Sequence, residues 1–228
     1  MPTKERYIIS LGGSLIVPDE IDVKFLREFR AIITREVARG KKFLLITGGG
    51  KTSRRYSDAA QALGQLNSHD LDWLGIHSTR LNGHLMRTIF RSLAHGRVVD
   101  DPARRVSAKE PVIIAAGYRP GWSTDYVAVL LAQKYQGQAV VNLSNIDYVY
   151  DRDPRKFKDA TPIKNISWAD FRKIVGNKWN PGLHLPFDPV ASKLAQKMKL
   201  KVVVMNGKNL PNLKNFLAGK KFEGTVIS

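Results

Sequence analysis

Two glycine runs, each directly behind a short apolar stretch, place the strongest constraint on how this chain folds. Gly-Gly-Ser at 12–14 follows the apolar stretch 7–11, and Gly-Gly-Gly-Lys at 48–51 follows the apolar stretch 43–47. Each arrangement predicts a strand, a glycine loop and a helix start, where backbone N–H groups and the helix N-terminus can hold an anion. Neither run matches the Walker A or G-x-G-x-x-G pattern, so the residues alone leave a tight turn and a phosphate cradle as equal alternatives.

Further apolar stretches alternate with segments of helical periodicity. Residues 112–116, 139–143 and 201–205 are typical of buried strands, and the helices expected between strands include one starting near Thr52 and one ending at Gly96. Apolar strands separated by amphipathic helices predict an α/β fold, a three-layer αβα sandwich around a mostly parallel sheet. Ligands of such sheets bind beyond the carboxyl ends of the strands, where both glycine loops are expected.

The composition excludes several classes of function. The net charge of +17 attracts polyanions, but the 37 Lys and Arg residues are distributed along the whole chain and form no basic tail. Nucleic-acid binding is therefore expected to be weak and non-specific at most. No apolar run approaches about 20 residues and no secretion signal is indicated, which predicts a cytoplasmic protein without membrane contact. The chain has no cysteine, and its five histidines form no zinc-type pattern, so no metal ligands are assigned.

Six motifs, taken in chain order, resemble those of the amino acid kinase family, and within it the uridylate (UMP) kinases of the short archaeal form. They are Leu11-Gly12-Gly13-Ser14, Gly48-Gly49-Gly50-Lys51 with Arg54 and Tyr56, Pro120-Gly121-Trp122-Ser123-Thr124-Asp125, Ser144-Asn145-Ile146-Asp147-Tyr148-Val149-Tyr150 with Asp153-Pro154, Phe187-Asp188-Pro189 with Ala191 and Lys193, and Gly224-Thr225. The resemblance covers nearly the entire chain.

This resemblance implies transfer of a phosphoryl group from ATP to UMP, giving UDP in pyrimidine nucleotide biosynthesis, with Mg²⁺ as cofactor and a homohexamer as the assembly. It also implies one amino acid kinase-like domain over residues 1–228. About 1–138 would form the half that holds the phosphate acceptor, and about 139–228 the half that binds ATP.

The resemblance further implies roles for individual residues. Those expected to bind UMP, with the aspartate at the ribose and the segment 118–124 around the phosphate and base, are Gly49, Asp72, Tyr118, Arg119, Pro120, Gly121, Trp122, Ser123 and Thr124. Those expected to bind ATP are Gly12, Gly13, Ser14, Gly50, Arg54, Ser144, Tyr150 and Asp153. The expected catalytic residues are Lys51, Arg54 and Asp188. Cations and glycine amides suit phosphoryl transfer, which depends on positioning and charge neutralisation more than on covalent chemistry.

Purely structural interpretations compete with several of these roles. Lys51 and Arg54, one turn apart at a helix start, also fit a solvated helix face. Asp188 before a proline is a good helix cap, and Thr124 is another. Tyr150 also fits ordinary packing at a strand end.

Two positions depart from the family pattern. Many members carry a lysine on the first strand, whereas residues 8–11 here read Ile-Ile-Ser-Leu, as in the short uridylate kinases. Lys51 is therefore the candidate for the cation that stabilises the transferring phosphoryl group. Tyr148 stands where the family usually has glycine in the loop that carries Ser144 and Tyr150.

Two other functions are compatible with the same fold. The first is isopentenyl phosphate kinase or another small-molecule kinase, but the former places a histidine just after the second glycine loop, and none occurs at 51–55. The second is a non-catalytic regulator that binds nucleic acid, which the net charge suggests although no aromatic RNA-reading motif is present.

Overall fold

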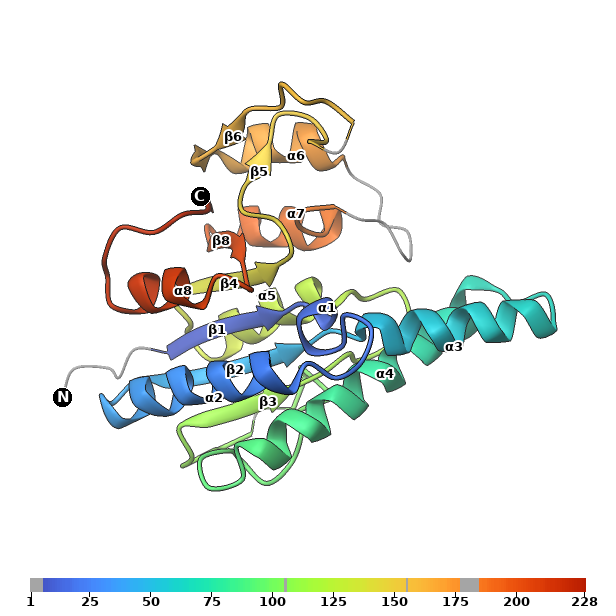
Figure 1. Ribbon diagram of the computed structural model, residues 1–228, viewed down its shortest axis with the longest axis horizontal. Coiled ribbons are helices and arrows are strands. Elements are labelled where there is room, and N and C mark those ends of the chain that lie inside the picture. The colour runs from blue at the N-terminus through green and yellow to red at the C-terminus, as the bar shows by residue number, and fades with distance from the viewer. Residues whose placement is uncertain (1–5, 105, 155, 177–184) are drawn as a thin grey trace.

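The computed structural model describes residues 6–104, 106–154, 156–176 and 185–228 (Figure 1). Its strands are β1 (Arg6–Leu11), β2 (Lys42–Thr47), β3 (Val112–Ala115), β4 (Ala139–Ser144), β5 (Val149–Tyr150), β6 (Pro162–Ile163), β7 (Asn165–Ile166), β8 (Lys201–Asn206) and β9 (Thr225–Ile227). Its helices are α1 (Gly13–Ile16), α2 (Val23–Ala38), α3 (Gly50–Leu63), α4 (Ser68–Ile89), α5 (Thr124–Lys134), α6 (Trp168–Val175), α7 (Pro189–Lys197) and α8 (Leu210–Leu217). Within the described ranges, no helix is both long and apolar enough to cross a bilayer.

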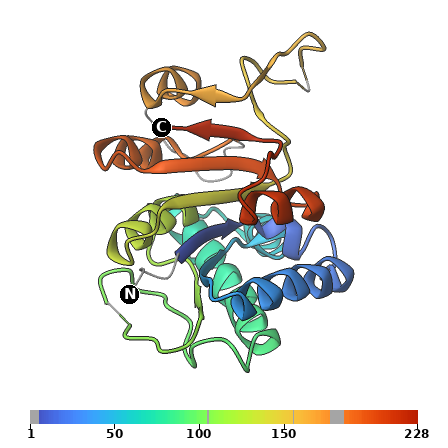
Figure 2. The ribbon, with the colours of Figure 1, turned by 90° about the vertical axis from the view of Figure 1, so that its left-hand side faces the viewer.

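Seven of these strands form one sheet in the order β3-β2-β1-β4-β8-β9-β7. The first five are mutually parallel, β9 runs antiparallel to β8, and β7 runs parallel to β9. Helices α5 and α7 lie on one side of the sheet and α2 and α8 on the other (Figure 2). The predicted α/β sandwich around a mostly parallel sheet is therefore confirmed.

Neighbouring residues of the central strands enter two different cores. Ile8 and Val140 pack into the core beneath α5, α6 and α7, whereas the next residues, Ile9 and Val141, pack into the core beneath α2, α4 and α8. All four side chains are fully buried. Because side chains alternate between the faces of a strand, a sheet covered on both faces needs the unbroken apolar runs seen in the sequence.

The two helices after the second glycine loop begin and end at other residues than predicted. Helix α3 starts at Gly50, the last glycine of the run, with Gly49 as its N-cap, and the expected start near Thr52 was late. Helix α4 ends at Ile89, and the expected end at Gly96 was wrong. The reason is tertiary: the backbone N–H of His95 donates to the carbonyl of Val112, so the chain leaves the helix to run beside β3.

Three of the expected helix starts can be checked by their caps. The Asp188 carboxylate accepts from the backbone N–H of Ala191 at 2.6 Å, and Ser167 caps α6, as predicted. Thr124 was wrong as a cap, because the Ser123 hydroxyl accepts from the N–H of Tyr126 at 3.1 Å and Thr124 is the first helical residue. The backbone of Ser123 is extended, as a capping residue requires.

The C-terminal part contains elements that the sequence pattern did not predict. They are the β5–β6 hairpin (Figure 1), the two-residue strand β7, the helix α8 and the closing strand β9. The Thr225 hydroxyl joins two of them, because it accepts from the N–H of Val149 and donates to the carbonyl of Ile163. The polar connection expected over 151–165 thus includes part of a hairpin.

The two glycine loops touch one another, which requires a residue without a side chain at Gly13. A Cβ atom on Gly13 would lie 2.0 Å from the backbone nitrogen of Gly50 and 2.7 Å from that of Gly49. Gly50 also has a φ of +66°, in the left-handed region that favours glycine. The contact fixes the loop after β1 against the loop after β2.

We expect Gly13→Ala to lower the free energy of unfolding by about 3 kcal/mol or more, because backbone atoms cannot move aside for the new methyl group. Gly96→Ala is the matched control, since nothing lies within 4 Å of a Cβ there, and its effect should stay within about 0.5 kcal/mol. Urea unfolding followed by circular dichroism measures both. Equal stability of the two variants would show that the loops separate easily.

Candidate active site at the strand ends

Each glycine loop is held by the end of a neighbouring strand. The N–H of Gly12 donates to the carbonyl of Leu143 at the end of β4, and the N–H of Gly48 donates to the carbonyl of Leu11 at the end of β1. The residues expected to bind phosphate therefore stand beyond the carboxyl ends of adjacent parallel strands. This is where ligands of such sheets bind.

Lys51 and Arg54 lie at the start of α3, directly after the second glycine loop. The backbone N–H of Lys51 donates to the carbonyl of Val17, which ties the start of α3 to the end of α1. The neighbouring Arg55 points elsewhere and donates to the carboxylates of Asp19 and Glu20 at 3.1 Å. Of the two adjacent arginines, only Arg54 lines the nearby cavity.

That cavity, called the acceptor cavity below, has a volume of about 380 Å³ and lies between α3, α4 and the segment after β3. It brings together five of the residues expected to bind UMP or ATP, which are Gly49, Arg54, Asp72, Trp122 and Thr124. Polar side chains of α3 complete one wall, including Ser57 and Asp58. The cavity therefore joins a cation, a carboxylate and an aromatic ring, as a nucleotide requires.

Helix α4 holds the expected acceptor segment by its main chain. The Thr79 hydroxyl accepts from the N–H of Gly117 at 2.8 Å, and Arg80 donates to the carbonyls of Gly117 and Tyr118 at 3.2 and 2.9 Å. Asp72 accepts from the N–H of Gly121 at 2.8 Å. One oxygen of Asp72 thus positions the loop, and Asp72 also lines the acceptor cavity.

The acceptor segment also carries a stack of aromatic rings. Trp122 packs edge-on against Tyr118 and Tyr126, with ring centroids 5.3 and 4.8 Å away. The Arg119 guanidinium lies 4.3 Å from the centroid of the Trp122 ring. Such cation–π contacts fix the orientation of a partly exposed ring, so Arg119 supports Trp122, and only Trp122 of the two lines the cavity.

Two neighbouring carboxylic acids lie beneath the strand ends. One oxygen of Asp125 accepts from the Ser10 hydroxyl of β1 and the other from the backbone N–H of Asp188, both at 3.2 Å. Loss of hydration among protein atoms, followed by the charge of Asp188, raises the pKa of Asp125 to about 7. Burial likewise raises the pKa of Asp188. A proton is therefore held at this pair well above the usual range of aspartate.

The residues expected to contact the adenine nucleotide lie along the chain that leaves β4. Ser144 ends β4, where its carbonyl accepts from the N–H of Gly207, while Tyr150 ends β5 and Asp153 starts a turn with Phe157. Neither Ser144, Tyr150 nor Asp153 lines the acceptor cavity. Their roles toward ATP remain predictions.

Comparison with known proteins identifies the family. The amino acid kinase family matches residues 5–206. The chain belongs to this family. It is 33% identical to a uridylate kinase of Thermoplasma volcanium over 226 residues, 98% of this chain and 97% of that protein. It is 30% identical to a uridylate kinase of Sulfurisphaera tokodaii, covering 97% and 98%. The crystal structure of uridylate kinase from Archaeoglobus fulgidus matches with a TM-score of 0.82 and 31% identity, over 97% of this chain and 99% of that one.

For this amino acid kinase, the sequence did not assign roles to several residues that shape the site. Thr79 and Arg80 act on main-chain atoms far along the chain, and Asn82 donates to the carbonyls of Gly48 and Gly49 at 2.8 and 3.2 Å. No local pattern marks such contacts. Asp125 did stand within one of the family motifs, and this signal could have found it.

The titration of Asp125 predicts a pH dependence of stability. Its folded pKa of about 7 lies above the ordinary aspartate value, so the folded state binds more protons than the unfolded chain between about pH 4 and 7. The contribution of protonated Asp125 to the free energy of unfolding is complete below that window and is lost as pH rises through it. We compare the free energy of unfolding of the wild type with that of Asp125→Asn. The wild-type value minus the variant value should fall as pH rises across the window, by at most about 1.4 kcal/mol per pH unit.

Urea unfolding of both proteins between about pH 4.5 and 8, which covers most of the expected window, measures this difference. Asp188 is retained in both proteins, so the comparison reports the charge at position 125 together with its coupling to Asp188. A difference that does not vary with pH would contradict a raised pKa at Asp125.

Proposed function

We propose that this chain catalyses transfer of the γ-phosphoryl group of ATP to UMP, giving ADP and UDP. The observation that carries the proposal is its likeness to uridylate kinases over nearly the whole of both chains, at 30 to 33% identity. The acceptor cavity supports it, because a ribose-binding carboxylate at Asp72 and a phosphate-binding cation at Arg54 face one space beside the glycine loops. No finding favours the isopentenyl phosphate or regulatory alternatives.

In this proposal a phosphate oxygen of UMP attacks the γ-phosphorus of ATP, and the bond from that phosphorus to the β–γ bridging oxygen breaks. ADP leaves with the electron pair of that bond. The protein supplies position and positive charge, which are the main sources of catalysis in phosphoryl transfer. Lys51 and Arg54, together with amides of the glycine loops, are assigned to neutralise the oxygens of the migrating group. Asp188 stays in the proposed catalytic set, next to Asp125.

The proposed donor is ATP with bound Mg²⁺. Within the described residues, no group of three or more His, Cys, Asp or Glu side chains is placed to hold a metal ion. The residues nevertheless fit Mg²⁺, because this ion commonly keeps several waters and takes most other ligands from substrate phosphates, with one or two carboxylates. Carboxylates near the strand ends include Asp58 and Asp72 of the acceptor cavity, together with Asp188. Bound Mg²⁺ would neutralise phosphate charge during transfer.

We also propose assembly into a homohexamer, with a cytoplasmic location. Helix α3 supports self-association, since none of its side chains is buried and its Tyr56 and Leu63 are 62% and 90% exposed. Exposed apolar groups on one helix are typical of subunit interfaces. The location remains a prediction from the sequence.

The acceptor is tested with purified protein, ATP, Mg²⁺ and a panel of UMP, CMP, dTMP, isopentenyl phosphate and acetylglutamate. We expect UMP to exceed CMP in kcat/KM by at least about 10²-fold, because a pocket that pairs the polar edge of uracil leaves groups unpaired against cytosine. A coupled assay of ADP release measures each rate. Efficient phosphorylation of isopentenyl phosphate, with none of UMP, would reject the acceptor and keep the fold.

The cationic roles are tested on α3 by three single variants. Lys51→Ala and Arg54→Ala should each lower kcat by about 10²–10³-fold, because charge developing on the migrating phosphoryl group loses its partner. Arg55→Ala is the matched control on the same helix, since this side chain pairs with Asp19 and Glu20 at the surface, and its kcat should change less than about twofold. Near-normal turnover of Lys51→Ala would assign the role of the missing first-strand lysine elsewhere.

A further inference from the structure

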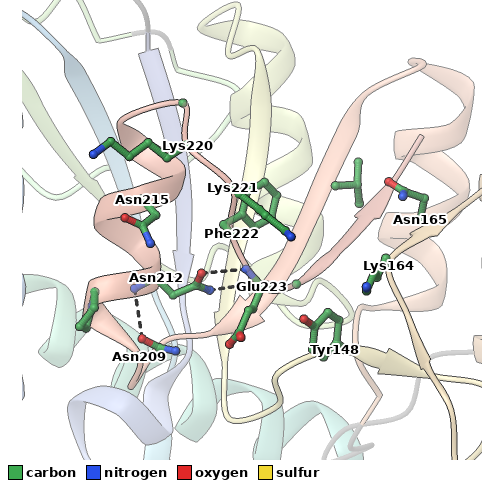
Figure 3. A pocket seen from close by; sticks show the side chains of 14 residues that line it. Tyr148, Lys164, Asn165, Asn209, Asn212, Asn215, Lys220, Lys221, Phe222 and Glu223 are labelled. Atoms are coloured by element: carbon green, nitrogen blue, oxygen red, sulfur yellow. Dashed lines mark hydrogen bonds between the residues drawn. The ribbon is translucent and has the colours of Figure 1, made fainter.

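A second and larger cavity, called the α8 cavity below, lies between α8, the loop 218–224 and the strands β7 and β9 (Figure 3). Its volume is about 790 Å³, within the range of small-molecule sites. It shares no lining residue with the acceptor cavity. None of the residues expected to bind ATP lines it either. The proposed kinase reaction therefore leaves this cavity without a role.

The α8 cavity is positively charged. Three lysines line it, Lys164, Lys220 and Lys221, against one acid, Glu223. In the part of the chain that the structure describes, no ion pair is formed by any of the three lysines. Figure 3 shows Lys221 and Lys164 extending into the space from opposite sides, whereas Lys220 points away from it. Two ammonium groups thus face one open volume, which favours an anionic ligand.

The loop that carries Lys220 and Lys221 is held in a fixed position. The Asn212 side chain donates to the carbonyl of Glu223 at 2.6 Å and accepts from its N–H at 2.8 Å (Figure 3). Asn212 is itself buried at the start of α8. On the other side, the Phe222 ring packs edge-on against Phe216 with centroids 5.0 Å apart. A cavity framed in this way is formed before any ligand binds, which lowers the cost of binding.

Tyr148 supplies an aromatic surface at one end of the same cavity, below Lys164 in Figure 3. This is the position where the family usually has glycine. Its ring is only partly buried, and burial together with the charge of Glu223 raises the pKa of its hydroxyl. The hydroxyl therefore stays protonated at neutral pH, and the ring offers a flat face on which a planar group can stack.

We propose that the α8 cavity is a second nucleotide site, which binds a nucleoside triphosphate with its phosphates at Lys164 and Lys221 and its base on Tyr148. Aromatic stacking accepts any base, while unpaired lysines supply the affinity for phosphate. Tyr148 belongs to the loop between Ser144 and Tyr150, and the neighbouring Asp147 accepts from Asn206 at 2.9 Å. A ligand here touches the loop that carries the expected ATP residues.

The test is isothermal titration of the full chain with ATP, GTP, CTP and UTP, each without UMP so that no turnover occurs. The charge variant is Lys164→Gln/Lys221→Gln. The control is Lys24→Gln/Lys109→Gln, which removes the same charge from exposed positions outside the cavity. We expect wild type and control to bind one more equivalent of at least one nucleotide than the charge variant does. Tyr148→Gly should weaken that extra equivalent by about tenfold or more.

Two results would overturn the proposal. One is the same number of bound equivalents in wild type and charge variant for all four nucleotides. The other is that the wild type binds only one equivalent of nucleotide and that the charge variant binds this same equivalent more weakly. The α8 cavity would then be an extension of the ATP donor site. Binding is measured without catalysis, so a failed kinase assay would reject the proposed function and leave this site standing.

Discussion

The contact between the two glycine loops is the constraint on which the rest of the site depends. Strands β1 and β2 lie in parallel register, so the loops after them emerge side by side, and Gly13 sits against the backbone of Gly49 and Gly50 without room for a side chain. This contact sets where α3 begins. The start of α3 in turn decides that Arg54 faces the acceptor cavity and that Arg55 faces the surface. Charge placement in the site is thus a consequence of backbone packing.

The acceptor side is organised in the same way, by side chains that bind main chain. Thr79, Arg80 and Asn82 of α4 each hold backbone atoms of a loop at the strand ends. Backbone groups cannot be withdrawn by rotation of a side chain, so loops held by them keep their shape before substrate arrives. Such pre-organisation favours catalysis by positioning, which suits phosphoryl transfer.

The acid pair shows how the departure from the family pattern is accommodated. The first strand offers the Ser10 hydroxyl to Asp125, in the segment where many family members carry a lysine. A hydroxyl satisfies one hydrogen bond but brings no positive charge to a carboxylate that Asp188 already repels. Burial among protein atoms, followed by the charge of Asp188, raises the pKa of Asp125 to about 7, so a proton partly neutralises this carboxylate.

The sequence by itself determined the sheet and the strand ends at which a site can form. Unbroken apolar runs such as 43–47 can only be buried on both faces of a sheet, and Asp188 carries a local backbone signal, a helix cap, that needs no distant partner. The tertiary structure alone decided the end of α4 and the hydrogen bonds that Arg80 donates to the acceptor segment. The physical reason is that these depend on contacts between residues far apart in the chain, such as Arg80 with Tyr118, whose free energy no local pattern records.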